Sequence, residues 1–314
     1  MDRVGFIGSP QAGSVARQIL NMGQCSMARW QPDDVEVDDE SDFVDLEELA
    51  DVPLIVVSTG IGRCRQIARM IGDVVTGRHI LVHTIRGLEE GTLNTASRIF
   101  YEETPTRRIG FVTGPMRLDD LQSERPASAV CASEFPEVHD LVEEAMMSPR
   151  FRVYHTRDLY GAELAAIYGR LVAVMSGLAD GLGLGASLQA TLFARGLAEM
   201  SRFVSSQGGR EKTPYGLAGA GNLYVDTLRD GDIDFNIGRF LADSSSQDLD
   251  ILLDKFGAPA TEIADILTAC ADASRQASLD LYLLEAVESL ILDDVEVSEV
   301  LRHLMTLPSF EEEE

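Results

Sequence analysis

Lysine is almost absent from this sequence: Lys212 and Lys255 are the only two among its 26 basic residues. A lysine that acts in catalysis therefore has few positions available. The four cysteines lie far apart and form no CxxC pair. Because structural zinc sites and disulfide frameworks need paired or clustered cysteines, we expect neither, and we expect no metal site.

Basic residues are also scarce: the sequence has 52 acidic and 26 basic residues, so its net charge is −26. A field of that sign repels phosphate backbones and anionic membranes, so we expect no nucleic-acid partner and no membrane partner. No apolar run approaches the roughly 18 residues of a membrane span. The opening residues read as a strand and not as a signal peptide, which predicts a cytoplasmic protein. An acidic, lysine-poor surface suits a cytoplasm of high salt, and a preference for arginine codons explains the lysine shortage equally well.

Apolar strands and amphipathic helices alternate through the first half of the chain, which is typical of a doubly wound parallel sheet. After about residue 158 the strand pattern stops and helical periodicity takes over. We therefore predict an α/β fold with a Rossmann-like dinucleotide-binding domain at 1–158 and an all-α domain at 159–314. Strands are expected at 3–8, 25–30, 53–60, 79–87, 108–115 and 127–133, helices at 9–23, 65–75, 161–185, 187–208, 248–257, 261–277, 281–292 and 298–307, and a glycine-rich loop at 213–227 near the domain interface.

The turn after the first expected strand occupies the place of the dinucleotide fingerprint GxGxxG. Gly8 and Gly13 have the required spacing, but Pro10 stands where the middle glycine lets the backbone approach the pyrophosphate. Proline removes an N–H donor and pushes Ser9 toward extended conformations. A helix N-terminus still attracts phosphate, so Gly8, Ser9, Pro10 and Gly13 are candidate cofactor contacts with weakened affinity for NAD. The acidic run after Trp30 would repel a ribose 2′-phosphate, which disfavours NADP.

The stretch GAELAAIYGRLVAVMSGLADGLGLG, residues 161–185, places Gly169 and Arg170 in the middle of an apolar helix. Glycine costs the helix up to about 1 kcal/mol relative to alanine. A buried, unpaired arginine costs several times more unless it meets an acid or an anion. One explanation pairs Arg170 with a structural carboxylate such as Asp120 or Glu163.

The other explanation is functional. In that case Arg170, Arg86 and Arg195 converge on a small anionic ligand between the two domains.

Several segments together resemble the NAD-dependent glycerol-3-phosphate dehydrogenases. The resemblance is strongest at 161–185, at FARGLAEMSRF (193–203) and at GLAGAGNL (216–223), and it extends to IRGLE (85–89) and TGP (113–115). It implies a Rossmann domain joined to a helical domain, an active site in the cleft between them, NAD as cofactor and a homodimer.

The resemblance also implies what each site position does. The family lysine that polarises the substrate oxygen and exchanges its proton falls on Gly169, and the neighbouring asparagine falls on Arg170. A second active-site lysine falls on Arg86, and the aspartate of the glycine-rich loop falls on Asn222. The family's Ser-Arg-Asn, which grips substrate phosphate and cofactor, resembles residues 234–236 and retains only Asn236.

These replacements bear on the chemistry. Reduction of a ketone needs a group that protonates the developing alkoxide. Glycine cannot do so, and arginine stays protonated at neutral pH. His83 and His155 are alternative acids, although each also reads as an ordinary strand-end or surface histidine.

We therefore expect a homologue that has lost the interconversion of glycerol 3-phosphate and dihydroxyacetone phosphate. It would act as a binding, regulatory or scaffolding protein. The alternative is an NAD-dependent oxidoreductase with a rebuilt site, acting on glycerol 3-phosphate or another small anionic substrate.

Overall fold

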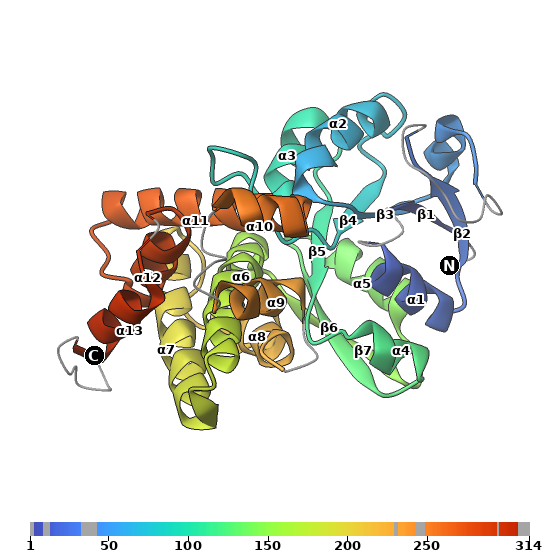
Figure 1. Ribbon diagram of the computed structural model, residues 1–314. Coiled ribbons are helices and arrows are strands. Elements are labelled where there is room, and N and C mark those ends of the chain that lie inside the picture. Colours follow the sequence, from blue (N-terminus) through green and yellow to red (C-terminus); the bar gives the residue numbers. More distant parts are fainter. Residues whose placement is uncertain are drawn as a thin grey trace.

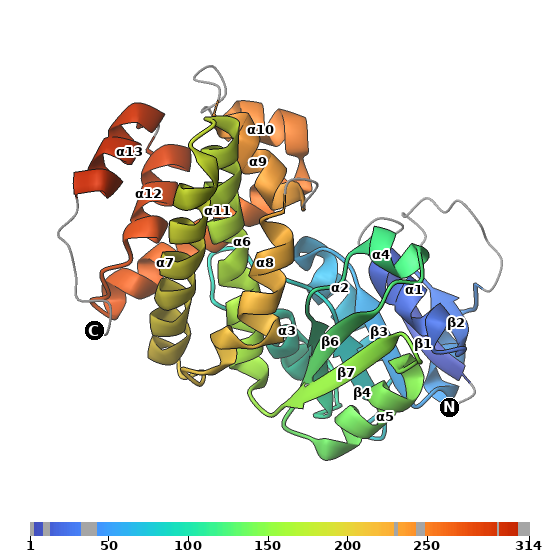
Figure 2. The same cartoon turned by 90° about the horizontal axis from the view of Figure 1, so that it is seen from below.

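The computed structural model describes residues 3–8, 13–32, 43–228, 232–242, 249–293 and 295–306. An α/β domain at the N-terminal end and a helical domain at the C-terminal end lie side by side (Figures 1 and 2). This arrangement confirms the predicted fold class. The last strand ends at Thr156 and the first helix of the helical domain begins at Leu159. The domain boundary after residue 158 stays a prediction.

Within the described residues, one seven-stranded sheet has the order β2-β1-β3-β4-β5-β6-β7. The first five strands in this order, β2, β1, β3, β4 and β5, run parallel to one another. Strand β6 is antiparallel to β5, and β7 is parallel to β6. The sheet is therefore parallel at the end that contains β1 and β3 and mixed at the other end. The strands are β1 (Arg3–Gly8), β2 (Ser26–Trp30), β3 (Leu54–Ser58), β4 (Ile80–His83), β5 (Ile109–Thr113), β6 (Ala127–Ala132) and β7 (Phe151–Thr156).

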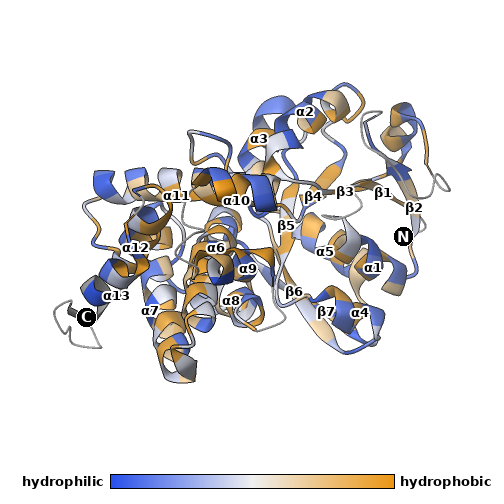
Figure 3. Cartoon of the chain, viewed as in Figure 1, coloured by the Kyte–Doolittle hydropathy of each residue, from blue (hydrophilic) through white to orange (hydrophobic). Residues whose placement is uncertain are grey.

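Helices cover both faces of the sheet. Alternate residues of each strand point to opposite faces, so each strand packs against helices on both sides. Val4 and Phe6 of β1 pack with one set of helices, whereas Ile7 packs with the other. Both faces are apolar for this reason, as Figure 3 shows for the strands. One face is covered by α1 (Ser14–Met22), α4 (Leu118–Gln122) and α5 (Pro136–Met146), and the other by η1 (Leu46–Asp51), α2 (Ile61–Gly72) and α3 (Ala96–Glu103).

The helical domain is built around α6 (Leu159–Gly181), which is buried over nearly its whole length. Asp158 caps it, since the carboxylate accepts a hydrogen bond from Gly161 N at 3.1 Å. The helix is long and apolar enough to cross a membrane, but its whole apolar window is buried inside the protein. The surrounding helices are α7 (Gly185–Ser206), α8 (Asn222–Asp226), α9 (Ile233–Leu241), α10 (Leu249–Phe256), α11 (Ala258–Gln276), α12 (Tyr282–Ile291) and α13 (Val297–Thr306).

The glycine-rich segment 213–227 differs from its prediction. It contains the short turn η2 (Thr213–Tyr215), the π-helix η3 (Leu217–Gly221) and then α8, so most of it is helical. A Cβ on Gly219 would lie 2.1 Å from Pro214 O, so this close approach needs glycine at that position. The glycines here allow tight packing and do not mark a loop. The segment does lie at the domain interface, as expected.

Candidate functional site

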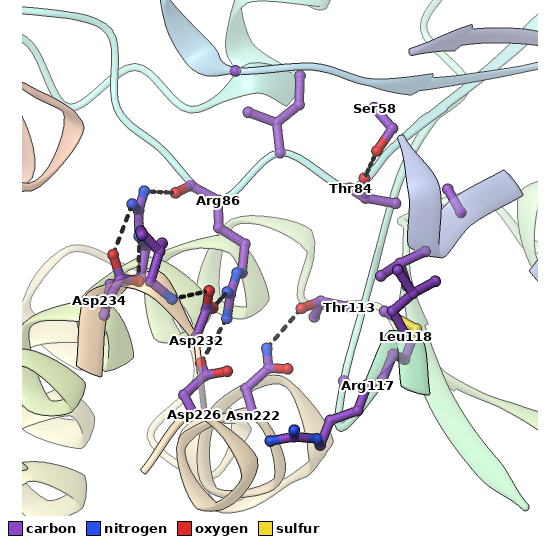
Figure 4. A pocket seen from close by; sticks show the side chains of 18 of the residues that line it. Ser58, Thr84, Arg86, Thr113, Arg117, Leu118, Asn222, Asp226, Asp232 and Asp234 are labelled. Atoms are coloured by element: carbon purple, nitrogen blue, oxygen red, sulfur yellow. Dashed lines mark hydrogen bonds and ion pairs between the residues drawn. The ribbon is translucent and has the colours of Figure 1, made fainter. Parts of the chain in front are cut away.

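A cleft of about 830 Å³ lies between the carboxyl ends of the parallel strands and the helical domain. The α/β domain contributes α1 and the residues that follow β3, β4 and β5, and the helical domain contributes α6, α8, α9 and α11 (Figure 4). Open parallel sheets bind their ligands at this edge, where the strand order reverses. Here that reversal falls between β1 and β3.

One end of the cleft fits a dinucleotide. Val15 and Ala16 of α1 line it, and Gly13 is the N-cap of that helix. A helix N-terminus is a ready site for a pyrophosphate. Ser58 and Thr84 line the same end, and their hydroxyl oxygens lie 2.6 Å apart.

Gly8 ends β1 and is required there by close packing. A Cβ at this position would lie 2.6 Å from the ring of Phe6 and 3.1 Å from Ser58 O. The expected cofactor contacts Ser9 and Pro10 lie outside the described residues. The described part of this end is therefore compatible with a nicotinamide dinucleotide.

The other end of the cleft is dominated by Arg86, which follows β4. Its Nη1 donates to Asp226 Oδ2 at 2.7 Å, and its Nη2 donates to Asp232 Oδ2. Burial lowers the pKa of Arg86, but the three carboxylates of Asp226, Asp232 and Asp234 outweigh it, so the pKa lies above its usual value. Arg86 is thus a permanent cation that is joined to two carboxylates of the other domain.

Arg170 meets carboxylates as well. Its Nε and Nη2 donate to the two oxygens of Asp234 at 2.9 and 3.0 Å. Its Nη1 donates to Glu262 Oε2 at 2.8 Å and to the backbone oxygen of Arg86 at 2.7 Å. Four hydrogen bonds therefore hold this buried guanidinium. The charge in the apolar helix is paired with carboxylates of the protein, as the structural explanation predicts.

The partners of Arg170 differ from the expected ones. Asp120 pairs with Arg125 at 2.8 Å on the surface. Glu163 is buried among hydrogen bonds from Thr95 Oγ1 and Ser97 N. The sequence pattern did not point to Asp234 or Glu262, because they lie 64 and 92 residues away along the chain.

Gly169 lies on the side of α6 that faces α7. A Cβ there would meet only Met200 Cε, at 3.4 Å, so a Cβ fits, although Gly169 is buried and does not line the cleft. Among the described residues that line the cleft, none is a lysine. Lys212 and Lys255 are both exposed elsewhere in the helical domain.

Asn222 lies in the cleft at the start of α8. Its Nδ2 donates to Thr113 Oγ1 at 2.6 Å and to Ala218 O at 3.2 Å. A second interdomain contact joins Ile61 N to Glu262 Oε1 at 3.3 Å. Side-chain and backbone groups of both domains are therefore tied together across the cleft.

Several predicted residues do not line the cleft. Arg195 is exposed on α7, and Asn236 is exposed on α9, where its Nδ2 bonds Asp232 O. From that segment Asp232, Ile233 and Asp234 line the cleft instead. One helical turn separates Asn236 from Asp232, but the side chain of Asn236 faces solvent.

The two histidines are ordinary. His83 is fully buried, bonds Ser97 Oγ at 2.8 Å and stacks on Phe111. His155 is exposed and lies 3.2 Å from Glu143 Oε2. Neither lines the cleft, so neither can protonate a ligand there without a rearrangement.

Asp226 is one of the titratable groups of the cleft that sequence reasoning missed. Burial raises its pKa to about 6, the neighbouring carboxylates of Asp232 and Asp234 add to the rise, and Arg86 opposes it. Its spacing of four residues from Asn222 was the one available signal, because residues four apart on a helix share a face.

The fold and the cleft define a two-domain protein of the Rossmann dehydrogenase class. Models of the NAD-dependent glycerol-3-phosphate dehydrogenase N-terminus and C-terminus match residues 32–139 and 158–302. The chain belongs to the NAD-dependent glycerol-3-phosphate dehydrogenase family.

Individual relatives and solved structures agree with this assignment. A glycerol-3-phosphate dehydrogenase (NAD(P)+) of Desulfitobacterium hafniense is 34% identical over 177 residues, which is 56% of this chain and 50% of that relative. The corresponding protein of Sinorhizobium fredii is 28% identical over 84% of this chain and 78% of its own length. The crystal structure of glycerol-3-phosphate dehydrogenase from Coxiella burnetii has a TM-score of 0.83 at 20% identity, covering 98% of this chain and 99% of that one. At that identity the structural likeness describes the fold alone.

Proposed function

We propose that this protein keeps the nicotinamide dinucleotide cleft of its family without interconverting glycerol 3-phosphate and dihydroxyacetone phosphate. It would act as a binding, regulatory or scaffolding homologue. The observation that supports this most is the pair at the centre of α6: Gly169 has no side chain, and Arg170 is committed to Asp234, Glu262 and a backbone oxygen.

The chemistry of ketone reduction supports the proposal. When a nicotinamide ring delivers hydride to a carbonyl carbon, the oxygen needs a proton, and a positioned acid contributes about 10²–10⁴-fold to the rate. Gly169 cannot supply it. Burial lowers the pKa of Arg170, but the Asp234 and Glu262 carboxylates outweigh burial and raise the pKa above its usual value. The guanidinium therefore retains its proton.

Cofactor preference, location and partners stay predictions. We expect NAD and not NADP, a cytoplasmic protein, a homodimer, and neither nucleic acid nor membrane as a partner. The expected small anionic ligand also stays a prediction, and the charges of the cleft bear on it below.

A second candidate function rests on Asp226. Its carboxyl lines the cleft and has a pKa of about 6, so near neutral pH a fraction of it holds a proton. A general acid works best when its pKa is near the working pH. Under this alternative the protein is an NAD-dependent oxidoreductase whose acid has moved from α6 to α8.

The test is oxidation of NADH by purified protein with dihydroxyacetone phosphate, at low and at molar salt. We expect no turnover above background at either salt, together with measurable binding of NADH by calorimetry. Turnover would contradict the proposal. The variant Asp226→Asn would then show whether Asp226 is the acid, because its loss should lower kcat by about 10²–10⁴-fold.

A gain-of-function variant complements this test. Gly169→Lys with Arg170→Asn restores the pair that the family resemblance places on α6, and a Cβ at Gly169 fits beside Met200. The variant Arg170→Asn alone is the matched control. Turnover in the double variant alone would attribute the loss to the missing lysine.

A further inference from the structure

We propose that Asp226 and Asp232 determine ligand specificity by taking the place of an anionic ligand at Arg86. The helical-domain end of the cleft then rejects phosphorylated and other anionic ligands and accepts uncharged or cationic ones. This inference rests on the proposed function, because it concerns what the cleft binds once the family substrate is no longer turned over.

The contacts of Arg86 support the inference first. Its two terminal nitrogens point to two different carboxylates, Asp226 at 2.7 Å and Asp232 (Figure 4). A guanidinium recognises phosphate by offering parallel N–H groups to two oxygens. Here each terminal nitrogen already donates to an aspartate of the other domain, so the cation is neutralised without a ligand.

Both aspartates are held in position by their own elements. Asp232 caps α9, and its Oδ1 accepts a hydrogen bond from Ile233 N at 2.7 Å, which leaves Oδ2 to face Arg86. Asp226 is 7% exposed at the end of α8, whose first residue Asn222 bonds Thr113 of the other domain. Asp232 cannot swing away from Arg86 without disturbing the start of α9, and burial confines Asp226.

The charge around Arg86 exceeds what neutralisation requires. Arg86 and Arg170 contact Asp226, Asp232, Asp234 and Glu262, so four carboxylates surround two guanidinium groups. Over the described lining of the whole cleft, Arg117 and Asp119 add one charge of each sign and leave the excess of two carboxylates unchanged. A phosphate dianion that enters this space meets a net negative wall, and both terminal nitrogens of Arg86 already contact carboxylates.

The nearby Asp119 supplies a matched control. It lines the same cleft, but it pairs with Arg117 at 3.1 Å and is 72% exposed. Its removal changes the net charge of the cleft by one unit without releasing Arg86. A comparison with Asp226 and Asp232 therefore separates the specific contact from the general field.

The experiment measures binding of inorganic phosphate by isothermal titration calorimetry, at constant ionic strength near pH 7.5, for the wild type and for Asp226→Asn/Asp232→Asn. Asparagine keeps the shape of aspartate and removes its charge. We expect the double variant to bind phosphate at least about tenfold more tightly than the wild type, because the released guanidinium makes charge-assisted bonds to phosphate. Asp119→Asn should bind no better than the wild type.

A third variant tests the role of Arg86 directly. Adding Arg86→Gln to the double variant should abolish the gained binding. If the double variant does not fold by circular dichroism, Asp232→Asn alone answers the question, since Asp232 is 28% exposed and tolerates the change better.

The outcomes separate the inference from the proposed function. Saturable phosphate binding by the wild type that Arg86→Gln abolishes, or no gain in the folded variants, overturns the inference. Turnover of dihydroxyacetone phosphate by the wild type overturns the proposed function, and it is measured in a different assay. A gain in Asp119→Asn equal to that of the double variant would show that only net charge matters, which also overturns the specific role of the two aspartates.

Discussion

At the scale of single residues, the role of a charged side chain depends on the groups that it contacts. Arg170 and Arg86 both replace family residues at the active site by sequence resemblance, and both are charged. In the folded protein Arg86 joins the two domains through Asp226 and Asp232. Arg170 binds Asp234 and Glu262 within the helical domain and reaches the other domain through the backbone oxygen of Arg86. An arginine at an active-site position therefore need not bind a ligand.

The stability of the protein should depend on Arg170. Arg170→Met leaves the buried Asp234 and the partly exposed Glu262 without their cation, and breaking a buried ion pair in this way costs about 3–5 kcal/mol. Arg239→Met is the control, because Arg239 is 49% exposed and lies 3.4 Å from Asp180, which is 8% exposed. The guanidinium of Arg239 stays in contact with water, so this variant should lose less stability than Arg170→Met.

Urea unfolding of both variants measures the difference in unfolding free energy. If Arg170→Met proves as stable as Arg239→Met, Arg170 is not a structural ion-pair partner.

At the scale of elements, the crossing of α6 and α9 sets the geometry of the cleft. A Cβ on Gly177 would lie 1.9 Å from Phe235 O, and a Cβ on Gly238 would lie 1.8 Å from Val174 O. Two glycines thus let the helix backbones touch. Because α9 also presents Asp232 and Asp234, this contact decides where those carboxylates lie.

Gly238→Ala should push the two helices apart. Overpacking of this kind costs about 1–3 kcal/mol, or more where the backbone cannot move. Gly62→Ala is the control: Gly62 lies on the exposed side of α2, and an added Cβ meets no atom within 4 Å. There alanine should stabilise the helix by up to about 1 kcal/mol.

Thermal unfolding of the two variants should therefore shift in opposite directions. Equal shifts would mean that the α6–α9 contact has room that the structure does not show.

The helices and strands also show which parts of the secondary structure the sequence patterns predict correctly. The long helix at 159–181 and most strands follow their predicted positions, because apolar periodicity reports local geometry directly. The segment 213–227 was expected to be a loop because of its glycines. It is largely helical, since packing against α6 and β6 stabilises a π-helix that local propensity disfavours.

At the scale of the whole molecule, the net charge of −26 is the dominant feature. Self-repulsion of this size destabilises a compact state, and salt screens it, because the Debye length falls to about 3 Å at 1 M. We expect Tm to rise steadily between low and molar sodium chloride. Choline chloride at equal ionic strength is the control for specific binding of sodium.

A Tm that falls with salt would mean that ion pairs, and not repulsion, dominate the electrostatics. The networks around Arg65, which contacts Glu89, Glu102 and Glu103, and around Arg86 would then be the main contributors.

The sequence by itself determined the class of fold, the order of the two domains and the family. These follow from local periodicity and from residues that are adjacent along the chain. Only the tertiary structure decided which of the 52 acidic residues neutralise Arg86 and Arg170. Their partners lie 64 to 146 residues away, and an ion pair depends on a few ångströms between side chains that packing alone brings together.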